Sequence, residues 1–203
     1  MPTRNKDLHG NVPDTSPVVL LLIDVINDLE FQGNESIIRA ARLMARRLAA
    51  LKARARKAAV ACIYVNDNFG RWKSDFNAQV EHCLKGKVPG SFLAEILRPE
   101  KDDYFVLKPK HSGFFSTTLD TVLRYLGAHT LILTGIAADR CVLFTANDAF
   151  LRDYRIFVPS DCVASNTPRD NRQALVLIER VLKADIRPSS KLRLQQIKKS
   201  RHE

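Results

Sequence analysis

The chain has 203 residues, of which 45% are hydrophobic and 27% are charged, and its formal net charge is +10. These proportions are typical of one globular domain, and they exclude a collagen-like chain, a disordered chain and a small disulfide scaffold. The longest apolar runs, Val18 to Ile23 and Ala58 to Val65, fall far short of the ~20 residues that a membrane span needs.

Apolar runs alternate with helix-period segments along the chain. Strands are predicted at Val18–Ile23, Val60–Val65, Tyr104–Leu107, Thr130–Thr134 and Arg155–Pro159, with a short sixth strand at Ala184–Arg187. Helices are predicted at Ile37–Ala55, around Phe76–Leu84, and at Leu119–Leu126, Cys141–Leu151 and Asn171–Leu182. Continuous apolar strands that alternate with helices predict an α/β fold. We expect a three-layer sandwich, with a six-stranded, mostly parallel sheet and helices on both faces.

The expected organisation is one domain with two polar ends. Residues 17–189 form the predicted domain, and residues 66–103 are its long irregular insert. Residues 1–16 are predicted to be a flexible N-terminal segment without the apolar region of a secretory signal, and residues 190–203 a basic C-terminal tail. The four cysteines show no CxxC pair and no spacing typical of a metal site. We therefore expect free thiols and a cytoplasmic protein.

Two segments hold the excess positive charge. Eight basic residues and no acid lie between Ser36 and Lys57, and six basic residues and one acid lie between Arg187 and Glu203. A basic helix and tail are able to bind a polyanion. Neither segment has interleaved aromatic residues or a nucleic-acid-binding motif, so we interpret them as a solvated helix face and tail and do not expect nucleic-acid binding.

Ligands of parallel α/β sheets bind at the carboxyl ends of the strands. The candidates there are Asp24 after the first strand, Lys108 after the third and Cys141 after the fourth. Cys141 begins a predicted helix, whose N–H groups and dipole stabilise a thiolate, and a nearby Lys108 would lower the thiol pKa further. Asp24 could take the thiol proton and later activate water. The alternative from spacing alone is a buried, inert cysteine.

Three segments together resemble the isochorismatase-like cysteine hydrolases, in the family's order. They are LLIDVIND at Leu21–Asp28, VLK at Val106–Lys108 with SGFF and TTL after it, and GIAADRCV at Gly135–Val142 with TA and DA after it. The resemblance covers about residues 17–165 and implies a Rossmann-type, six-stranded parallel sheet. It also implies an Asp–Lys–Cys catalytic triad, carried here by Asp24, Lys108 and Cys141.

The resemblance has further consequences for the nucleophile segment. It implies a cis peptide bond at Ile136–Ala137, which would aim the N–H groups of Ala137 and Cys141 at a developing oxyanion. Lys110 lies two residues after Lys108 and would face the same side of an extended strand. The motif favours Lys108 as the triad lysine and places Lys110 at the rim or in solvent.

Nicotinamidases of the family bind a metal through Asp and His residues after the second strand. The corresponding stretch here, Asn66 to Trp72, contains no histidine, and His82 stands alone in the sequence around it. We therefore expect no metal and no cofactor, which argues against nicotinamide as the substrate. The candidate substrate-binding residues are Asn68, Arg71, Trp72, Phe114 and Phe115, with Phe31 as a further aromatic side chain. The alternative for each of them is core packing or solvation.

The resemblance and the cysteine predict a metal-independent hydrolase that cleaves a C–N bond of a small amide, ureido or carbamoyl compound through a thioester. One alternative is an isochorismatase-type vinyl ether hydrolase. Another is a catalytically idle member that binds a polyanion or a protein through the basic segments. The resemblance also implies a homo-oligomer, a dimer or a tetramer, and no membrane partner is expected.

Overall fold

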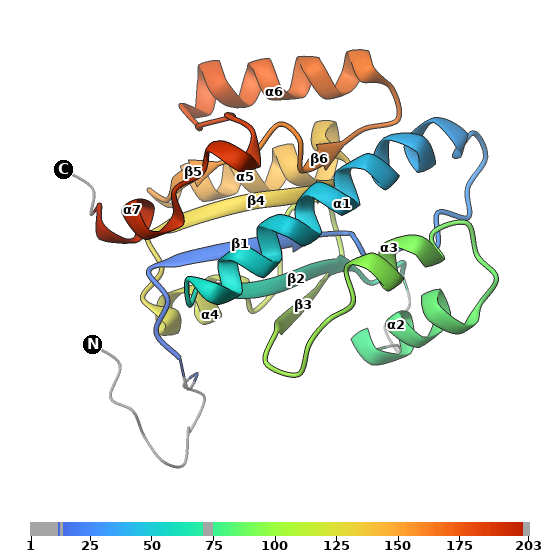
Figure 1. Cartoon of the computed structure of the whole chain (residues 1–203), viewed down its shortest axis with the longest axis horizontal. Coiled ribbons are helices and arrows are strands. Elements are labelled where there is room, and N and C mark those ends of the chain that lie inside the picture. Colours follow the sequence, from blue (N-terminus) through green and yellow to red (C-terminus); the bar gives the residue numbers. More distant parts are fainter. Residues whose placement is uncertain (1–11, 13, 71–74, 201–203) are drawn as a thin grey trace.

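A computed structural model of the chain describes residues 12, 14–70 and 75–200, and it is a three-layer α/β sandwich (Figure 1). The strands are β1 (Val18–Ile23), β2 (Ala61–Asp67), β3 (Tyr104–Lys108), β4 (Thr130–Ile136), β5 (Arg155–Phe157) and β6 (Val163–Ala164). Their order is β3-β2-β1-β4-β5, β6 also pairs with β4, and all pairs are parallel. The predicted fold class is confirmed.

Helices cover both faces of this sheet. One face packs against α1 (Glu35–Lys57), α2 (Phe76–Lys85), α3 (Ser91–Ile96) and α7 (Leu194–Lys199). The other packs against α4 (Leu119–Leu126), α5 (Leu143–Phe150) and α6 (Pro168–Leu182). No helix in the described part of the chain has both the length and the apolar character needed to cross a membrane.

The central strand β1 explains why its sequence is an unbroken apolar run. Leu20 and Leu22 belong to the core on the α1 side, whereas Leu21 and Ile23 belong to the core on the α4 side. Successive side chains of a strand point to opposite faces, so a strand covered on both faces must be apolar at every position. Burial of β1 is complete along its length.

The structure differs from the sequence prediction in three elements. The sixth strand is Val163–Ala164, while Asp185 in the predicted strand makes only an isolated parallel bridge to Phe157. The helix predicted from Cys141 is preceded by a π-helical turn, η1 (Ala138–Val142), which contains that cysteine. The insert also contains α3, which its short apolar pattern did not reveal.

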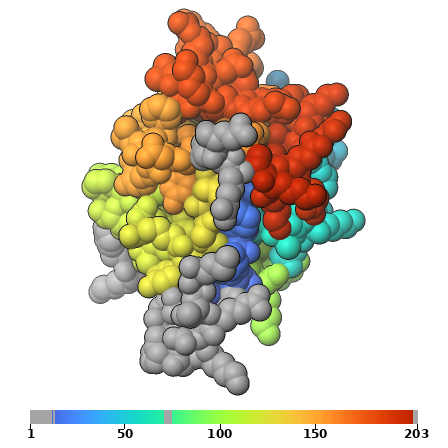
Figure 2. Space-filling model, turned by 90° about the vertical axis from the view of Figure 1, so that its left-hand side faces the viewer, coloured from blue at the N-terminus to red at the C-terminus, as the bar shows by residue number. Residues whose placement is uncertain are grey.

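The C-terminal stretch packs against the domain. A 3-10 turn, η2 (Ser189–Lys191), leads into α7, and Leu192, Leu194 and Ile197 are buried. Arg54 of α1 donates to the carbonyls of Ser189 (3.0 Å) and Leu192 (2.5 Å). Figure 2 shows this segment in red beside the end of α1 in cyan. The stretch predicted to be a basic tail from residue 190 onward therefore packs against the core through Leu192, Leu194 and Ile197.

Ends and basic residues that looked solvated in the sequence also have structural partners. Ser16, placed in the predicted flexible segment, is buried, and its hydroxyl accepts a hydrogen bond of 2.9 Å from the Ala61 N–H. The buried Lys52 ammonium lies 2.6 Å from an Asp103 carboxylate oxygen and 3.0 Å from the Tyr64 hydroxyl. Arg56 contacts Asp103 as well, at 3.2 Å. Part of the basic face of α1 thus anchors the loop before β3.

Gly135 allows β4 to lie close to β1 near the carboxyl ends of both strands. Its φ is +112°, and a Cβ atom there would lie 2.0 Å from the Ile23 carbonyl oxygen. Gly127, the C-cap of α4, also has a positive φ of +69°, but a Cβ atom there would meet nothing within 4 Å. An alanine at Gly127 would suffer backbone strain alone, whereas an alanine at Gly135 would suffer both strain and steric overlap.

We predict that Gly135→Ala lowers the free energy of unfolding by more than about 3 kcal/mol, because strain and overlap act together. Gly127→Ala, with strain alone, should lose about 1–2 kcal/mol. Urea denaturation of both variants measures the difference. Equal losses would show that the approach of Gly135 to Ile23 is not a constraint.

Candidate active site

The carboxyl ends of four neighbouring strands, β3, β2, β1 and β4, bring four reactive side chains together. Asp24 directly follows β1, Asp67 and Lys108 are the last residues of β2 and β3, and Cys141 lies in η1 after β4. Asp67 and Lys108 are direct partners in the β2–β3 register. Parallel pairing therefore delivers these groups to one edge of the sheet, as the strand-end rule predicts.

Asp24 is held in position by its neighbours on both sides. Its backbone has a φ of +51°, in the left-handed region that aspartate tolerates better than most residues. Its N–H donates to the Val65 carbonyl at 2.9 Å. One carboxylate oxygen accepts a bond of 2.6 Å from the Asp67 N–H, and the other lies 2.9 Å from the Lys108 ammonium.

Lys108 is fully buried at the centre of the group. Its Nζ atom lies 2.9 Å from Asp24 Oδ2, 3.3 Å from Asp67 Oδ2 and 3.5 Å from Cys141 Sγ. Burial lowers the pKa of Lys108, but the charge and hydrogen bond of Asp24 and the charge of Asp67 raise it, so the pKa lies above its ordinary value. Lys108 therefore remains an ammonium ion between two carboxylates and the thiol. Lys110 is exposed.

Cys141 lies at the start of the helical segment that follows β4. Thr145 donates to its carbonyl at 2.6 Å, which ties the turn to α5. The Ile136–Ala137 peptide bond before this turn is cis. On the open side of the thiol, His111 places Nδ1 3.7 Å from Sγ. The sulfur thus lies between a buried ammonium and an exposed imidazole.

The protonation of the site differs from the sequence-based expectation. Burial raises the pKa of the Cys141 thiol to about 12, the Asp24 charge raises it too, and Lys108 acts in the opposite direction. Burial also raises the pKa of Asp24, against the charge of Lys108 and a hydrogen bond from Cys141. The expectation of a thiol pKa below its free value was wrong because desolvation outweighs the lysine. The resting thiol is protonated and needs a base in contact with it.

A cavity of about 500 Å³ opens beside the thiol. Its lining includes Asp24, Cys141, His111, Arg140, Asn27 and Phe31. This volume is in the range of small-molecule sites in proteins. The carboxylate and the thiol therefore both face a space that a small substrate can enter.

The predicted substrate-binding residues lie in different places. Asn68 is buried, and its side-chain oxygen accepts a hydrogen bond of 2.9 Å from the Gly70 N–H, which closes a turn. Phe114 packs in the core on the α4 side, 6.1 Å from the Tyr154 ring centroid, while Phe115 is exposed. None of these three is among the described residues that line the cavity.

Two further residues predicted to bind substrate cannot be placed, and three residues near the thiol were not predicted. Arg71 and Trp72 lie outside the described residues. The sequence analysis did not single out Asp67, whose register partner in β3 is Lys108. It missed His111, which lies three residues after Lys108. It also missed Arg140, which directly precedes the cysteine and lines the cavity.

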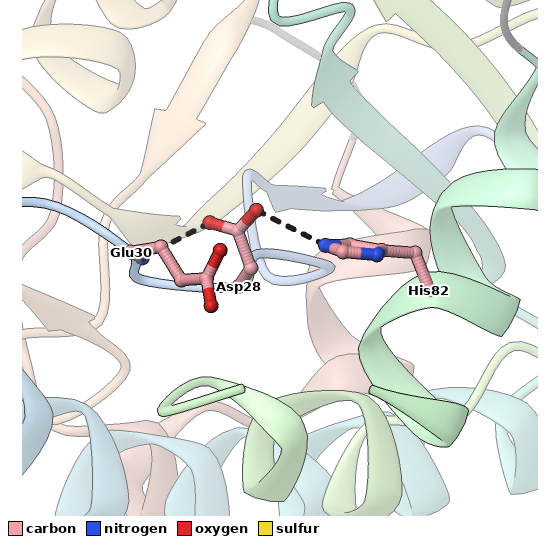
Figure 3. Close-up of side chains that lie close together, drawn as sticks. All are labelled: Asp28, Glu30 and His82. Carbon is pink, nitrogen blue, oxygen red and sulfur yellow. Dashed lines mark hydrogen bonds and ion pairs between the residues drawn. The ribbon is translucent and has the colours of Figure 1, made fainter. Parts of the chain in front are cut away.

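A separate group of metal-type ligands lies between the loop after β1 and α2 (Figure 3). Asp28, Glu30 and His82 have ligand atoms within 4.8 Å of one another. Asp28 already contacts His82 Nε2 at 3.4 Å and accepts a hydrogen bond of 3.1 Å from the Glu30 N–H. These contacts explain the cluster as a link between loop and helix. The absence of a metal from the chemistry stays a prediction.

A family model for the isochorismatase domain matches residues 18–185. The chain belongs to the isochorismatase family. It is 40% identical over 167 residues to YaaI, an isochorismatase family protein of Bacillus subtilis, covering 82% of this chain and 91% of YaaI. It is also 40% identical over 82 residues to the ureidoacrylate amidohydrolase RutB of Serratia proteamaculans, but that match covers only 40% of this chain and 33% of RutB.

Solved structures agree with this assignment. The N-carbamoylsarcosine amidase of Thermoplasma acidophilum has a TM-score of 0.68 and 28% identity, covering 87% of this chain and 98% of the amidase. A cysteine hydrolase of Pseudomonas syringae has a TM-score of 0.71 at 22% identity, over 89% of this chain and 93% of that one, and shows the fold alone. The chain is a hydrolase of the isochorismatase family, which acts on small molecules.

We predict that Asp24→Asn lowers the apparent pKa of the Cys141 thiol. The substitution removes a negative charge that raises this pKa, and the thiolate then faces the Lys108 ammonium. Iodoacetamide alkylation across pH, with the modified cysteine located by mass, measures the shift. Asp28→Asn on the same loop should leave Cys141 unchanged, since Asp28 is not among the groups that shift its pKa. An unchanged or higher pKa in Asp24→Asn would contradict this electrostatic account.

Proposed function

We propose that this isochorismatase-family hydrolase cleaves a C–N bond of a small amide, ureido or carbamoyl compound. The catalytic residues in this proposal are Asp24, Lys108 and Cys141, and no metal takes part. The observation that carries it is the buried Lys108 ammonium, which contacts both the Asp24 carboxylate and the Cys141 sulfur. A carboxylate, a cation and a thiol in contact beside a cavity are the parts that nucleophilic catalysis by cysteine requires.

In the first half of the reaction, Asp24 takes the proton from the Cys141 thiol. The sulfur attacks the substrate carbonyl carbon, and the N–H groups of Ala137 and Cys141 bind the oxyanion that develops. The C–N bond then breaks, and the leaving amine takes the proton from Asp24. Lys108 keeps its proton and balances the negative charge as it moves from carboxylate to sulfur and back.

In the second half, Asp24 removes a proton from water, and the resulting nucleophile attacks the thioester. The S–C bond breaks, and the proton on Asp24 returns to the Cys141 sulfur. One carboxylate serves as base and acid in both halves because it contacts the sulfur and faces the cavity. The raised pKa of Asp24 suits this exchange, since the conjugate acid of a weakly stabilised carboxylate forms readily.

Amide-type substrates are favoured over ethers by the presence of the thiol and by the relatives. RutB and the carbamoylsarcosine amidase are named for ureido and carbamoyl substrates. A role as an idle polyanion-binding protein is less favoured, because Lys52 and Arg54 of the basic helix are bonded to the protein itself. Residues 39–57 are therefore not a uniformly free basic face.

Self-association is part of this proposal. On α6, Val176, Leu177 and Val181 are 44%, 45% and 54% exposed. Neighbouring apolar side chains on a surface helix are typical of an interface between proteins. The homo-oligomer stays a prediction that follows from the family resemblance.

We predict that the protein releases ammonia from at least one member of a panel of primary amides, N-carbamoyl acids and ureido acids. Cys141→Ala should reduce this rate by at least about 10³-fold, because the nucleophile is lost. Cys83→Ala, which removes a buried thiol on α2, is the matched control and should keep the activity. Undiminished activity in Cys141→Ala would refute the proposal, and activity on isochorismate alone would replace it with ether hydrolysis.

A further inference from the structure

A second cation, Arg140, lies at the cavity beside the nucleophile. Its residue directly precedes Cys141, and its side chain lines the same space. The guanidinium side chain is 59% exposed, and its ion pair with the neighbouring Asp139 is long, with 3.8 Å between Nε and Oδ2. The described residues that line the cavity include no other lysine or arginine. Arg140 is therefore available to an incoming molecule.

The charges around Lys108 explain why an anionic substrate would need a further cation at the cavity. Lys108 is shared between Asp24 and Asp67, so one positive charge meets two carboxylates. The inner end of the site therefore carries an excess of negative charge, which repels an anion. Arg140 places a positive charge in the cavity lining, and its long 3.8 Å pairing with Asp139 leaves its donors open to an anion. Without it, the cavity would favour neutral or cationic molecules.

We propose that Arg140 binds a carboxylate of the substrate, so that the substrate class is a small amide, ureido or carbamoyl acid. This inference rests on the proposed function and names the chemistry that Arg140 would select. A guanidinium presents a planar fork of donors that matches a carboxylate in a bidentate manner. Because Arg140 and Cys141 line the same cavity of about 500 Å³, one small molecule can place a carboxylate at Arg140 and a carbonyl carbon at Cys141.

Two alkylating reagents test this without any knowledge of the substrate. Iodoacetate and iodoacetamide both form an S–C bond with cysteine and release iodide, and they differ only in carboxylate against carboxamide. The ratio of their rate constants at Cys141 cancels changes in thiol pKa, which affect both reagents alike. We expect Arg140→Gln to lower the iodoacetate-to-iodoacetamide ratio by about tenfold. Arg140→Lys should keep part of the preference, since it retains the charge but loses the fork.

A matched control removes the same charge elsewhere. Arg124 on α4 is 72% exposed and pairs with Asp120 at 3.2 Å, and it does not line the cavity. Arg124→Gln should leave the ratio unchanged. An equal fall in both variants would assign the effect to net charge and overturn the proposal, as would an unchanged ratio in Arg140→Gln.

A second readout needs no reactive thiol. In a Cys141→Ala background, titration calorimetry compares N-carbamoylglycine with the neutral N-propylurea. Tighter binding of the acid, lost on adding Arg140→Gln, supports the carboxylate site, whereas equal binding of the two overturns it. The two proposals fail separately: an Arg140-dependent preference without ammonia release would refute only the hydrolase, and ammonia release without that preference would refute only the Arg140 site.

Discussion

The buried ammonium of Lys108 is the constraint on which the site and much of the fold depend. A charge with no access to water is tolerated only when groups inside the protein neutralise it and accept its hydrogen bonds. Lys108 meets this requirement with Asp24 and Asp67, which extend from the ends of two other strands. The registers of β1, β2 and β3 are therefore fixed together with the chemistry, and the same cation lies within 3.5 Å of the Cys141 sulfur.

The surrounding fold makes this arrangement rigid. The β1 strand is apolar on both faces and lies between β2 and β4, so its carboxyl end cannot move without disturbing two cores. Polar contacts hold the adjoining loop as well: the Asn66 side chain accepts from the Ile26 N–H and donates to its carbonyl. A preorganised site of this kind spends little free energy on ordering its groups when substrate binds.

Much of this could be predicted from the sequence, and the limits have physical causes. Apolar runs located the main strands, and the strand-end rule with the family resemblance selected Asp24, Lys108 and Cys141. Periodicity does not give side-chain direction in loops or in the short turn η1, so His111 and Arg140 were missed. For Phe114 it left pocket lining and core packing open, and the residue packs in the core. Nor does periodicity measure desolvation, which reverses the expected direction of the thiol pKa shift. The two-residue strand β6 is too short for its pattern to distinguish it from a loop.

The most direct test of the central claim is the detection of the covalent intermediate. An amide that the protein hydrolyses is mixed with it, the reaction is quenched in acid during turnover, and the intact protein and its peptides are weighed. The account predicts a mass increase equal to the acyl group, located on Cys141 and removed by hydroxylamine. Turnover with no adduct, or with an adduct on another residue, in samples quenched early enough to precede thioester hydrolysis, would contradict nucleophilic catalysis at this cysteine.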